Sequence, residues 1–117
     1  MEDINKIELE GRVGNVSVIN VGGTSVAHVS LATNEALSNG RGEVALGTVW
    51  HCVTIWRGED VPDPASIRKG DRLHVEGRVR VNKFTGNDNV EKLFYEVIAH
   101  RAEIVKTKRR TPLAARV

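Results

Sequence analysis

Residues 72–82, RLHVEGRVRVN, contain the clearest structural pattern in this sequence. Apolar residues or glycine occupy the odd positions from Leu73 to Val81, and charged or polar residues occupy the even positions. A period of two places all the apolar side chains on one face of a β-strand. We therefore predict a strand here, with Leu73, Val75 and Val79 facing a hydrophobic core.

The same period of two recurs on both sides of this stretch, and no long segment shows the 3.6-residue period of a helix. Three further strands are predicted before it and one after it, over residues 6–13, 25–33, 48–56 and 93–105. Glycine-rich segments separate these strands. Gly22 and Gly23 predict a turn, SNGRGEVALG at residues 38–47 predicts a loop, and TGNDN at residues 85–89 predicts a hairpin turn.

Two prolines limit what can form between the third and fourth predicted strands. Pro62 and Pro64 leave room only for a short helix over about residues 63–69, ended by Gly70. The chain order is then three strands, a short helix and two strands, which is the order of an oligonucleotide/oligosaccharide-binding (OB) barrel. We predict an all-β fold, a five-stranded OB-fold Greek-key barrel with one short helix between strands 3 and 4.

Length and composition indicate one globular domain. The 117 residues have room for a single core, and 40% hydrophobic and 27% charged residues are ordinary for a soluble protein. No run of eighteen apolar residues predicts a membrane span, and the first residues, MEDINKIELE, do not resemble a secretory signal. The single cysteine, Cys52, cannot form an intrachain disulfide. We expect a cytoplasmic protein.

The charge is divided unevenly along the chain. Residues 1–105 contain all 15 acidic residues but only 12 Lys and Arg, whereas residues 106–117 contain the other 5 basic residues and no acidic residue. We predict an OB-fold domain over 1–105 and a disordered basic tail over 106–117. The domain is not basic overall, so phosphate binding by it would depend on local clusters and on stacking. The tail either adds non-specific phosphate affinity or is inert.

The predicted strand TVWHCVTIW contains both tryptophans of the chain. Trp50 and Trp56 share one face, and Val49, Val53 and Ile55 share the other, so one of these two sets must enter the core. The tryptophans could fill the core, or they could face outward. The other strands supply Val, Ile, Leu, Ala and Gly to the core, and a small barrel lined in this way has little space for two indoles. This favours exposed tryptophans, roughly 20 Å apart at about 3.3 Å per residue, which suits stacking with the bases of a single strand.

Phe84 is a third candidate aromatic residue, at the end of the strand that carries Arg80 and next to Lys83. It either stacks with a base or folds back onto the rim of the barrel. Arg80 and Lys83 are either solvated charges or, beside an exposed aromatic ring, contacts to phosphate.

Signals of catalysis or cofactor binding are missing from the sequence. His51 and Cys52 are adjacent on one strand and point to opposite faces, while His28, His74 and His100 come from different strands without ligand spacing. The sequence contains no phosphate-binding glycine loop with a lysine and no recognisable nucleophile. We predict no metal, no cofactor and no enzyme activity.

Five blocks of the sequence resemble the bacterial single-stranded DNA-binding protein family in their order and spacing. They are INKIELEGRVGN, SVAHVSLATNE, TVWHCVTIW, IRKGDRLHVEGRVRVNKFTG and YEVIAHRAEIV, and they cover most of residues 4–105. The resemblance implies an OB fold that binds single-stranded DNA without sequence preference in replication, recombination and repair. It also implies a homotetramer, associated with the nucleoid in the cytoplasm.

The resemblance also implies roles for individual residues. Trp50, Trp56 and Phe84 match stacking positions of the family, and His51 matches a histidine associated with subunit packing. Lys6, Lys69 and Lys83 match basic positions along the DNA path, and we add Arg80 and Arg41 as predicted phosphate contacts.

The sequence departs from the family pattern at three places. Ala36 and Leu37 replace a stacking tryptophan, and the segment over residues 57–69 is short. Many members recruit replication and repair proteins through a glycine-rich linker and an acidic tip, which have no counterpart here. Three explanations of this difference stay open: truncation, a mobile-element form and another mode of recruitment. Two other functions stay open: a primosomal-type OB protein that bridges DNA and replication-restart proteins, and a protein-interaction module with its indoles in an interface.

Overall fold

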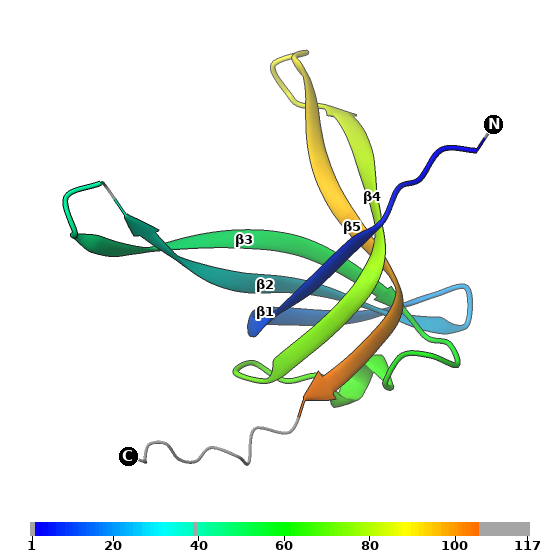
Figure 1. Cartoon of the computed structure of the whole chain (residues 1–117). Coiled ribbons are helices and arrows are strands. Elements are labelled where there is room, and N and C mark those ends of the chain that lie inside the picture. Colours follow the sequence, from blue (N-terminus) through cyan, green and yellow to red (C-terminus); the bar gives the residue numbers. More distant parts are fainter. Residues whose placement is uncertain (1, 39, 106–117) are drawn as a thin grey trace.

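Five long strands and one turn of helix make up most of the structure, a computed structural model that describes residues 2–38 and 40–105. The elements are β1 (Ile7–Val21), β2 (Thr24–Ser38), β3 (Val44–Trp56), η1 (Pro64–Ser66), β4 (Arg72–Thr85) and β5 (Glu91–Val105). Figure 1 shows the strands coiling around a common centre, with η1 at the end of the barrel away from the tip of the β4–β5 hairpin.

The strands close into a barrel in the order β1-β2-β3-β5-β4. β1, β2 and β3 form an antiparallel meander, and β4 and β5 form an antiparallel hairpin. Two seams join these units: β1 pairs with β4 antiparallel, and β3 pairs with β5 in parallel. The predicted five-stranded OB barrel is confirmed.

A β-bulge in β1 explains why this strand is longer than the predicted residues 6–13. The register changes from Val13 opposite Leu31 to Asn15 opposite Ser30, which leaves Gly14 as an extra residue. A bulge reverses the alternation of the residues that follow it. Val13 is therefore buried on one side of the bulge, and Val16 packs against the same core on the other. The break in the period of two was misread as the end of the strand.

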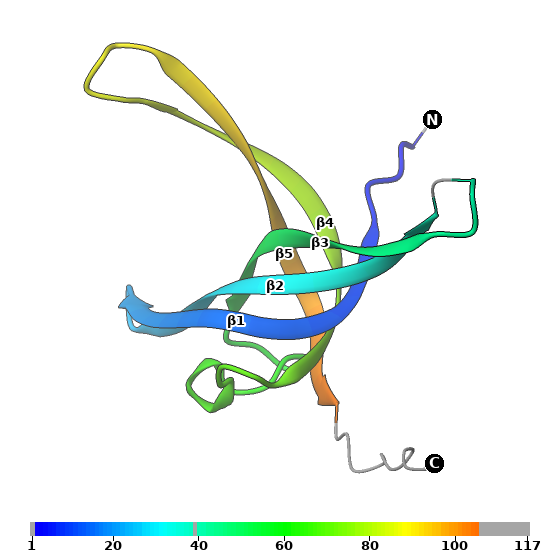
Figure 2. The same cartoon turned by 90° about the vertical axis from the view of Figure 1, so that its left-hand side faces the viewer.

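The β2–β3 hairpin and the β4–β5 hairpin extend beyond the barrel (Figures 1 and 2). The strands of both hairpins are longer than predicted. β2 and β3 stay paired as far as Ser38 opposite Val44, so half of the loop predicted over residues 38–47 is strand. Among residues 2–38 and 40–105, no third strand pairs with these extensions. Val49 is consequently exposed and Val79 only half-buried, although both were predicted to be buried.

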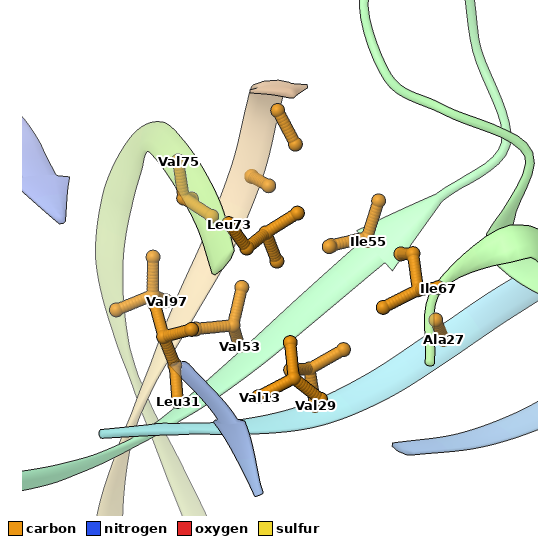
Figure 3. Packing of buried hydrophobic residues seen from close by; sticks show 12 residues of the cluster. Val13, Ala27, Val29, Leu31, Val53, Ile55, Ile67, Leu73, Val75 and Val97 are labelled. Atoms are coloured by element: carbon orange, nitrogen blue, oxygen red, sulfur yellow. The ribbon is translucent and has the colours of Figure 1, made fainter. Parts of the chain in front are cut away.

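Small apolar side chains from all five strands fill the barrel (Figure 3). Val53, Ile55, Leu73 and Val75 are fully buried, as predicted. A Cβ atom at Gly77 would lie 2.1 Å from the carbonyl oxygen of Ile98, so only glycine permits this close approach of β4 to β5.

The helix predicted over residues 63–69 is reduced to the single 3-10 turn η1. Asp63 caps it by accepting a hydrogen bond from the backbone N–H of Ala65 at 3.1 Å. The backbone is already extended at Ile67, whose buried side chain lies beside Ile55 and Ala27 in Figure 3. The turn therefore ends at Ser66, before the predicted end at residue 69.

Within residues 2–38 and 40–105, no helix has the length and apolar character needed to cross a membrane. The predicted basic tail, residues 106–117, lies outside the described residues. The division into a domain and a tail therefore stays a prediction.

Candidate nucleic-acid interface

Strands β3, β4 and β5 turn one face away from the core, and we call this the outer face. Alternation along each strand and the pairing between strands place the following residues on it: Trp50, Cys52, Thr54, Trp56, Arg78, Arg80, Asn82, Phe84, Phe94, Glu96 and Ile98. It therefore contains all three predicted stacking residues.

Both tryptophans are exposed, as predicted, with 59% of Trp50 and 42% of Trp56 accessible. The indole of Trp50 lies over Gly14, where a Cβ atom would approach its ring to 2.4 Å. Trp56 is paired in register with Val26, which is only 1% exposed although it faces outward. Each indole is thus supported on one side and accessible on the other, as stacking with a planar ligand requires.

Phe84 projects from the β4–β5 hairpin on the outer face and is 50% exposed. It does not fold back onto the barrel rim, because it belongs to a paired strand of the projecting hairpin. Its ring contacts Phe94 edge-to-face, with centroids 6.0 Å apart and planes at 68°. Sequence reasoning did not single out Phe94. Register counting across the hairpin, which places Phe94 opposite Asn82, was the signal that could have found it.

Arg80 is the predicted phosphate contact that shares the outer face with the aromatic residues. Its Nη2 donates a hydrogen bond to Oδ1 of Asn82 at 3.0 Å, and its Nε lies 4.0 Å from Oε1 of Glu96. These contacts orient the guanidinium, which is half-exposed and available to a further anion.

The other predicted phosphate contacts are exposed but dispersed. Lys83 projects from the opposite face of the hairpin to Phe84, and its Nζ lies 3.8 Å from Glu91. Arg41 lies in the connection between β2 and β3, Lys6 precedes β1, and Lys69 lies between η1 and β4. Two of these four residues adjoin the surroundings of the aromatic set: Lys83 precedes Phe84 in β4, and Lys6 precedes Ile7, which lines a hollow together with Trp50.

A groove of about 390 Å³ crosses the outer face between β3 and the β4–β5 hairpin. Glu96 lies in it, with one carboxylate oxygen accepting a hydrogen bond from Thr54 Oγ1 and the other from Asn82 Nδ2. Burial alone would raise the pKa of Glu96, but these hydrogen bonds and the nearby Arg80 and His28 outweigh it and hold the pKa below 4.5. Glu96 is therefore ionised at neutral pH.

His51 lies on the core side of β3, where β3 leaves the barrel. Its Nε2 is 2.9 Å from Oγ1 of Thr33, and burial lowers its pKa below 6.5, so the ring is neutral at pH 7. Together with Ile7, Val79 and Tyr95 it lines a hollow of about 290 Å³. Its predicted role in subunit packing stays a prediction.

His74 takes part in an ion cluster across β1 and β4 that sequence spacing did not reveal. Its Nδ1 lies 3.0 Å from Glu10, and its Nε2 lies 2.8 Å from Glu8 and 3.8 Å from Glu76. The hydrogen bond to Glu10 raises the pKa of His74 above 6.5, despite the opposing effect of burial, and the charge of Glu8 adds to this rise.

The donor atoms of Glu8, His74 and Glu76 lie within 4.8 Å of one another and could in principle hold a metal ion. The carboxylates on both ring nitrogens instead favour imidazolium, which has no lone pair for a metal. The predicted lack of a metal site remains a prediction.

Residues 4–105 match the Single-strand binding protein family. The chain belongs to this family. A single-stranded DNA-binding protein of Xylella fastidiosa is 32% identical over 104 residues, which are 87% of this chain and 63% of that protein. The mitochondrial single-stranded DNA-binding protein 1-A of Xenopus laevis is 36% identical over 107 residues, which are 82% of this chain and 73% of that protein. The chain spans about three-fifths of the length of the bacterial relatives, 60% for the protein from Neisseria meningitidis.

Solved structures of the single-strand binding protein family share the fold. The Plasmodium falciparum SSB complex with ssDNA superposes with a TM-score of 0.72 at 28% identity, over 90% of this chain and 96% of that chain. A deletion mutant of the single-stranded DNA-binding protein from Thermus aquaticus also gives a TM-score of 0.72, over 90% of this chain and 52% of that chain. Its 18% identity supports the common fold alone.

Proposed function

We propose that this chain binds single-stranded DNA without sequence preference and protects it during replication, recombination and repair. The observation that carries the proposal is the pair of indoles on the outer face, each supported on one side and accessible on the other. The names of the relatives and the Plasmodium falciparum complex with ssDNA support it. The chain acts by binding, without catalytic chemistry, in the cytoplasm at the nucleoid.

Stacking supplies most of the binding free energy in this proposal. Trp50, Trp56 and Phe84 each contribute about 1–3 kcal/mol by stacking with a base, which tolerates any sequence. Residues 1–105 contain 15 acidic and 12 basic residues, so no general positive field attracts the backbone. Arg80 contacts phosphate beside the aromatic residues, and the dispersed cations Lys6, Arg41, Lys69 and Lys83 contact it along the path to and from the outer face.

The protein functions as a homotetramer in this proposal, with His51 in a subunit interface. Exposed apolar side chains on the core side of the two projecting hairpins support self-association, because a monomer rarely exposes such a surface. They include Val49 on β3, and Leu93 and Tyr95 on β5.

Titration of tryptophan fluorescence with oligo-dT, alongside mass determination in solution, tests the proposal. We expect strong quenching, since both tryptophans lie on the proposed binding surface, and the mass of a tetramer. Fluorescence that oligo-dT leaves unchanged would contradict DNA binding through the indoles. Binding by a dimer would instead favour a primosomal-type protein that bridges DNA and replication-restart proteins.

A further inference from the structure

We propose that the groove between β3 and the β4–β5 hairpin is a nucleobase site that prefers bases with an exocyclic amino group. Phe94 forms its stacking wall, and Glu96 accepts a hydrogen bond from the amino group. This inference rests on the proposed binding of single-stranded DNA and adds a local preference to it. The groove has a volume of about 390 Å³, and its lining includes His28, Ser30, Cys52, Asn82, Phe94 and Glu96.

The position of the groove places it between the stacking residues. Cys52 and Thr54 line it from β3, and on that strand Trp50 and Trp56 flank these two residues on the outer face. On the other side, Phe94 separates the groove from Phe84. A single strand that stacks on Trp50 or Trp56 and continues to Phe84 therefore crosses the groove.

Phe94 has the properties of a stacking wall. Its side chain is 43% exposed, lines the groove and is held by the edge-to-face contact with Phe84. A ring that is fixed in this way loses little conformational entropy when a base stacks on it.

Glu96 determines what can enter the groove. Its carboxylate is ionised and only 12% of its side chain is exposed, so a phosphate placed there would be repelled. A carboxylate accepts hydrogen bonds and donates none, and each oxygen keeps a free lone pair after bonding to Thr54 or Asn82. The groove therefore suits a group that donates.

Cytosine, adenine and guanine each carry an exocyclic amino group that donates hydrogen bonds, whereas thymine has no amino group and offers a single ring N3–H between two carbonyl oxygens. Binding of a single strand remains tolerant of sequence because stacking dominates it, but the base that reaches Glu96 is preferentially one with an amino group (cytosine, adenine or guanine) rather than thymine. Oligo-dC and oligo-dT isolate this contribution, since both carry single-ring bases.

The test compares the dissociation constants of oligo-dC and oligo-dT for the full chain and two variants. We expect Phe94→Ala to weaken binding of both oligonucleotides about 5-fold or more. Glu96→Gln should weaken binding of oligo-dC, relative to binding of oligo-dT, about 5-fold or more. Glu59→Gln removes the same charge from an exposed loop residue and should leave the ratio unchanged.

Cys52 supplies an independent readout, because it is the single cysteine of the chain, is exposed and lines the groove. Bound oligo-dC should slow its reaction with a thiol reagent in the wild type, and less so in Phe94→Ala.

If Phe94→Ala lowers the thermal midpoint, Phe94→Leu keeps the bulk and removes the aromatic ring. Phe94→Ala should also weaken binding when Phe84 is already replaced by Ala. In that double variant, the loss of the Phe94 ring cannot act by displacing Phe84.

The outcomes separate the two proposals. A wild type that binds neither oligonucleotide overturns the proposed function. A wild type that binds both, with Phe94→Ala and Glu96→Gln unchanged in affinity and ratio and Cys52 equally reactive with and without DNA, overturns the groove site and leaves the proposed function intact.

Discussion

The indole of Trp50 lies over Gly14, the extra residue of the bulge in β1. A Cβ atom at position 14 would lie 2.4 Å from Cζ3 and 2.7 Å from Cη2 of this indole, closer than real side chains approach. An irregularity in one strand thus makes room for an aromatic side chain on another, and the position of this stacking residue depends on a glycine with no side chain of its own.

Gly14→Ala should displace the Trp50 indole and weaken binding of oligo-dT, by at most the about 1–3 kcal/mol that one stacking residue supplies. The loss in unfolding free energy should be smaller than the loss in binding, because the exposed indole can swing outward. Gly58→Ala is the matched control, since a Cβ atom there would meet only the carbonyl oxygen of Trp56 at 3.8 Å. Fluorescence titration measures both variants, and equal affinities for them would contradict a positioning role for Gly14.

Stacking should outweigh charge in the binding of oligo-dT. Trp50→Ala, Trp56→Ala and Phe84→Ala should each cost about 1–3 kcal/mol. Lys83→Ala should cost less, because Lys83 lies near Glu91 and on the opposite face of the hairpin from Phe84. It should also reduce the slope of log K against log salt by about 0.7 if one phosphate contact is lost. Titrations at several salt concentrations provide both quantities, and similar losses for all four variants would argue against this order.

The hydrogen bond between His74 and Glu10 should stabilise the barrel most in mildly acidic solution. It raises the pKa of His74 above 6.5, so this contribution is fully present below pH 6.5 and is lost as pH rises through the raised value. The hydrogen bonds from His74 and Arg72 lower the pKa of Glu10 below 4.5, so that contribution is present above pH 4.5 and is lost as pH falls through the lowered value.

Urea unfolding at about pH 5.5 and about pH 8.5 tests this expectation for the wild type and for His74→Gln. The wild type should lose more unfolding free energy between the two values than the variant does. The effect should be small because the cluster is partly exposed to solvent. Parallel pH profiles for the two proteins would show that the His74–Glu10 bond does not contribute.

The basic segment over residues 106–117 should add non-specific affinity for phosphate. It contains 5 basic residues and no acidic residue, in contrast to the rest of the chain. Deletion of this segment should weaken oligo-dT binding at low salt, with a difference that fades as salt rises, because screening removes the attraction. Titration at two salt concentrations measures this, and a salt slope that the deletion leaves unchanged would assign the segment no role in DNA binding.

The fold was predictable wherever a strand has a neighbour on both sides inside the barrel. Leu73 and Val75 on β4 are buried as their alternation predicted, because β1 and β5 both pair with that part of the strand. The prediction was wrong where this condition ends. Val79 was predicted to be buried, but it lies beyond Gly77, the last residue of β4 that pairs with β1, and it is only half-buried. Alternation reveals the face of a strand, whereas burial depends on what covers that face.

The candidate site was predictable where it depends on one strand alone. Trp50 and Trp56 face outward, which the volume available in the core already favoured. Phe94 and Glu96 could not be assigned to the same face without the register of the β4–β5 hairpin. The contact of His74 with Glu10 could not be predicted from the sequence either, because it depends on pairing between β1 and β4, which are distant in the chain.

The parallel seam between β3 and β5 consists of two residue pairs, Val53 with Val97 and Thr54 with Ile98. The groove lies across this seam, with Thr54 on one side and Glu96 on the other. Neither the β1–β3 meander nor the β4–β5 hairpin contains the groove by itself. Contacts between distant segments form late in folding, because closing a long loop costs entropy. An oligonucleotide in the proposed site would therefore select barrels that have finished folding, and its binding free energy would slow their reopening at the seam.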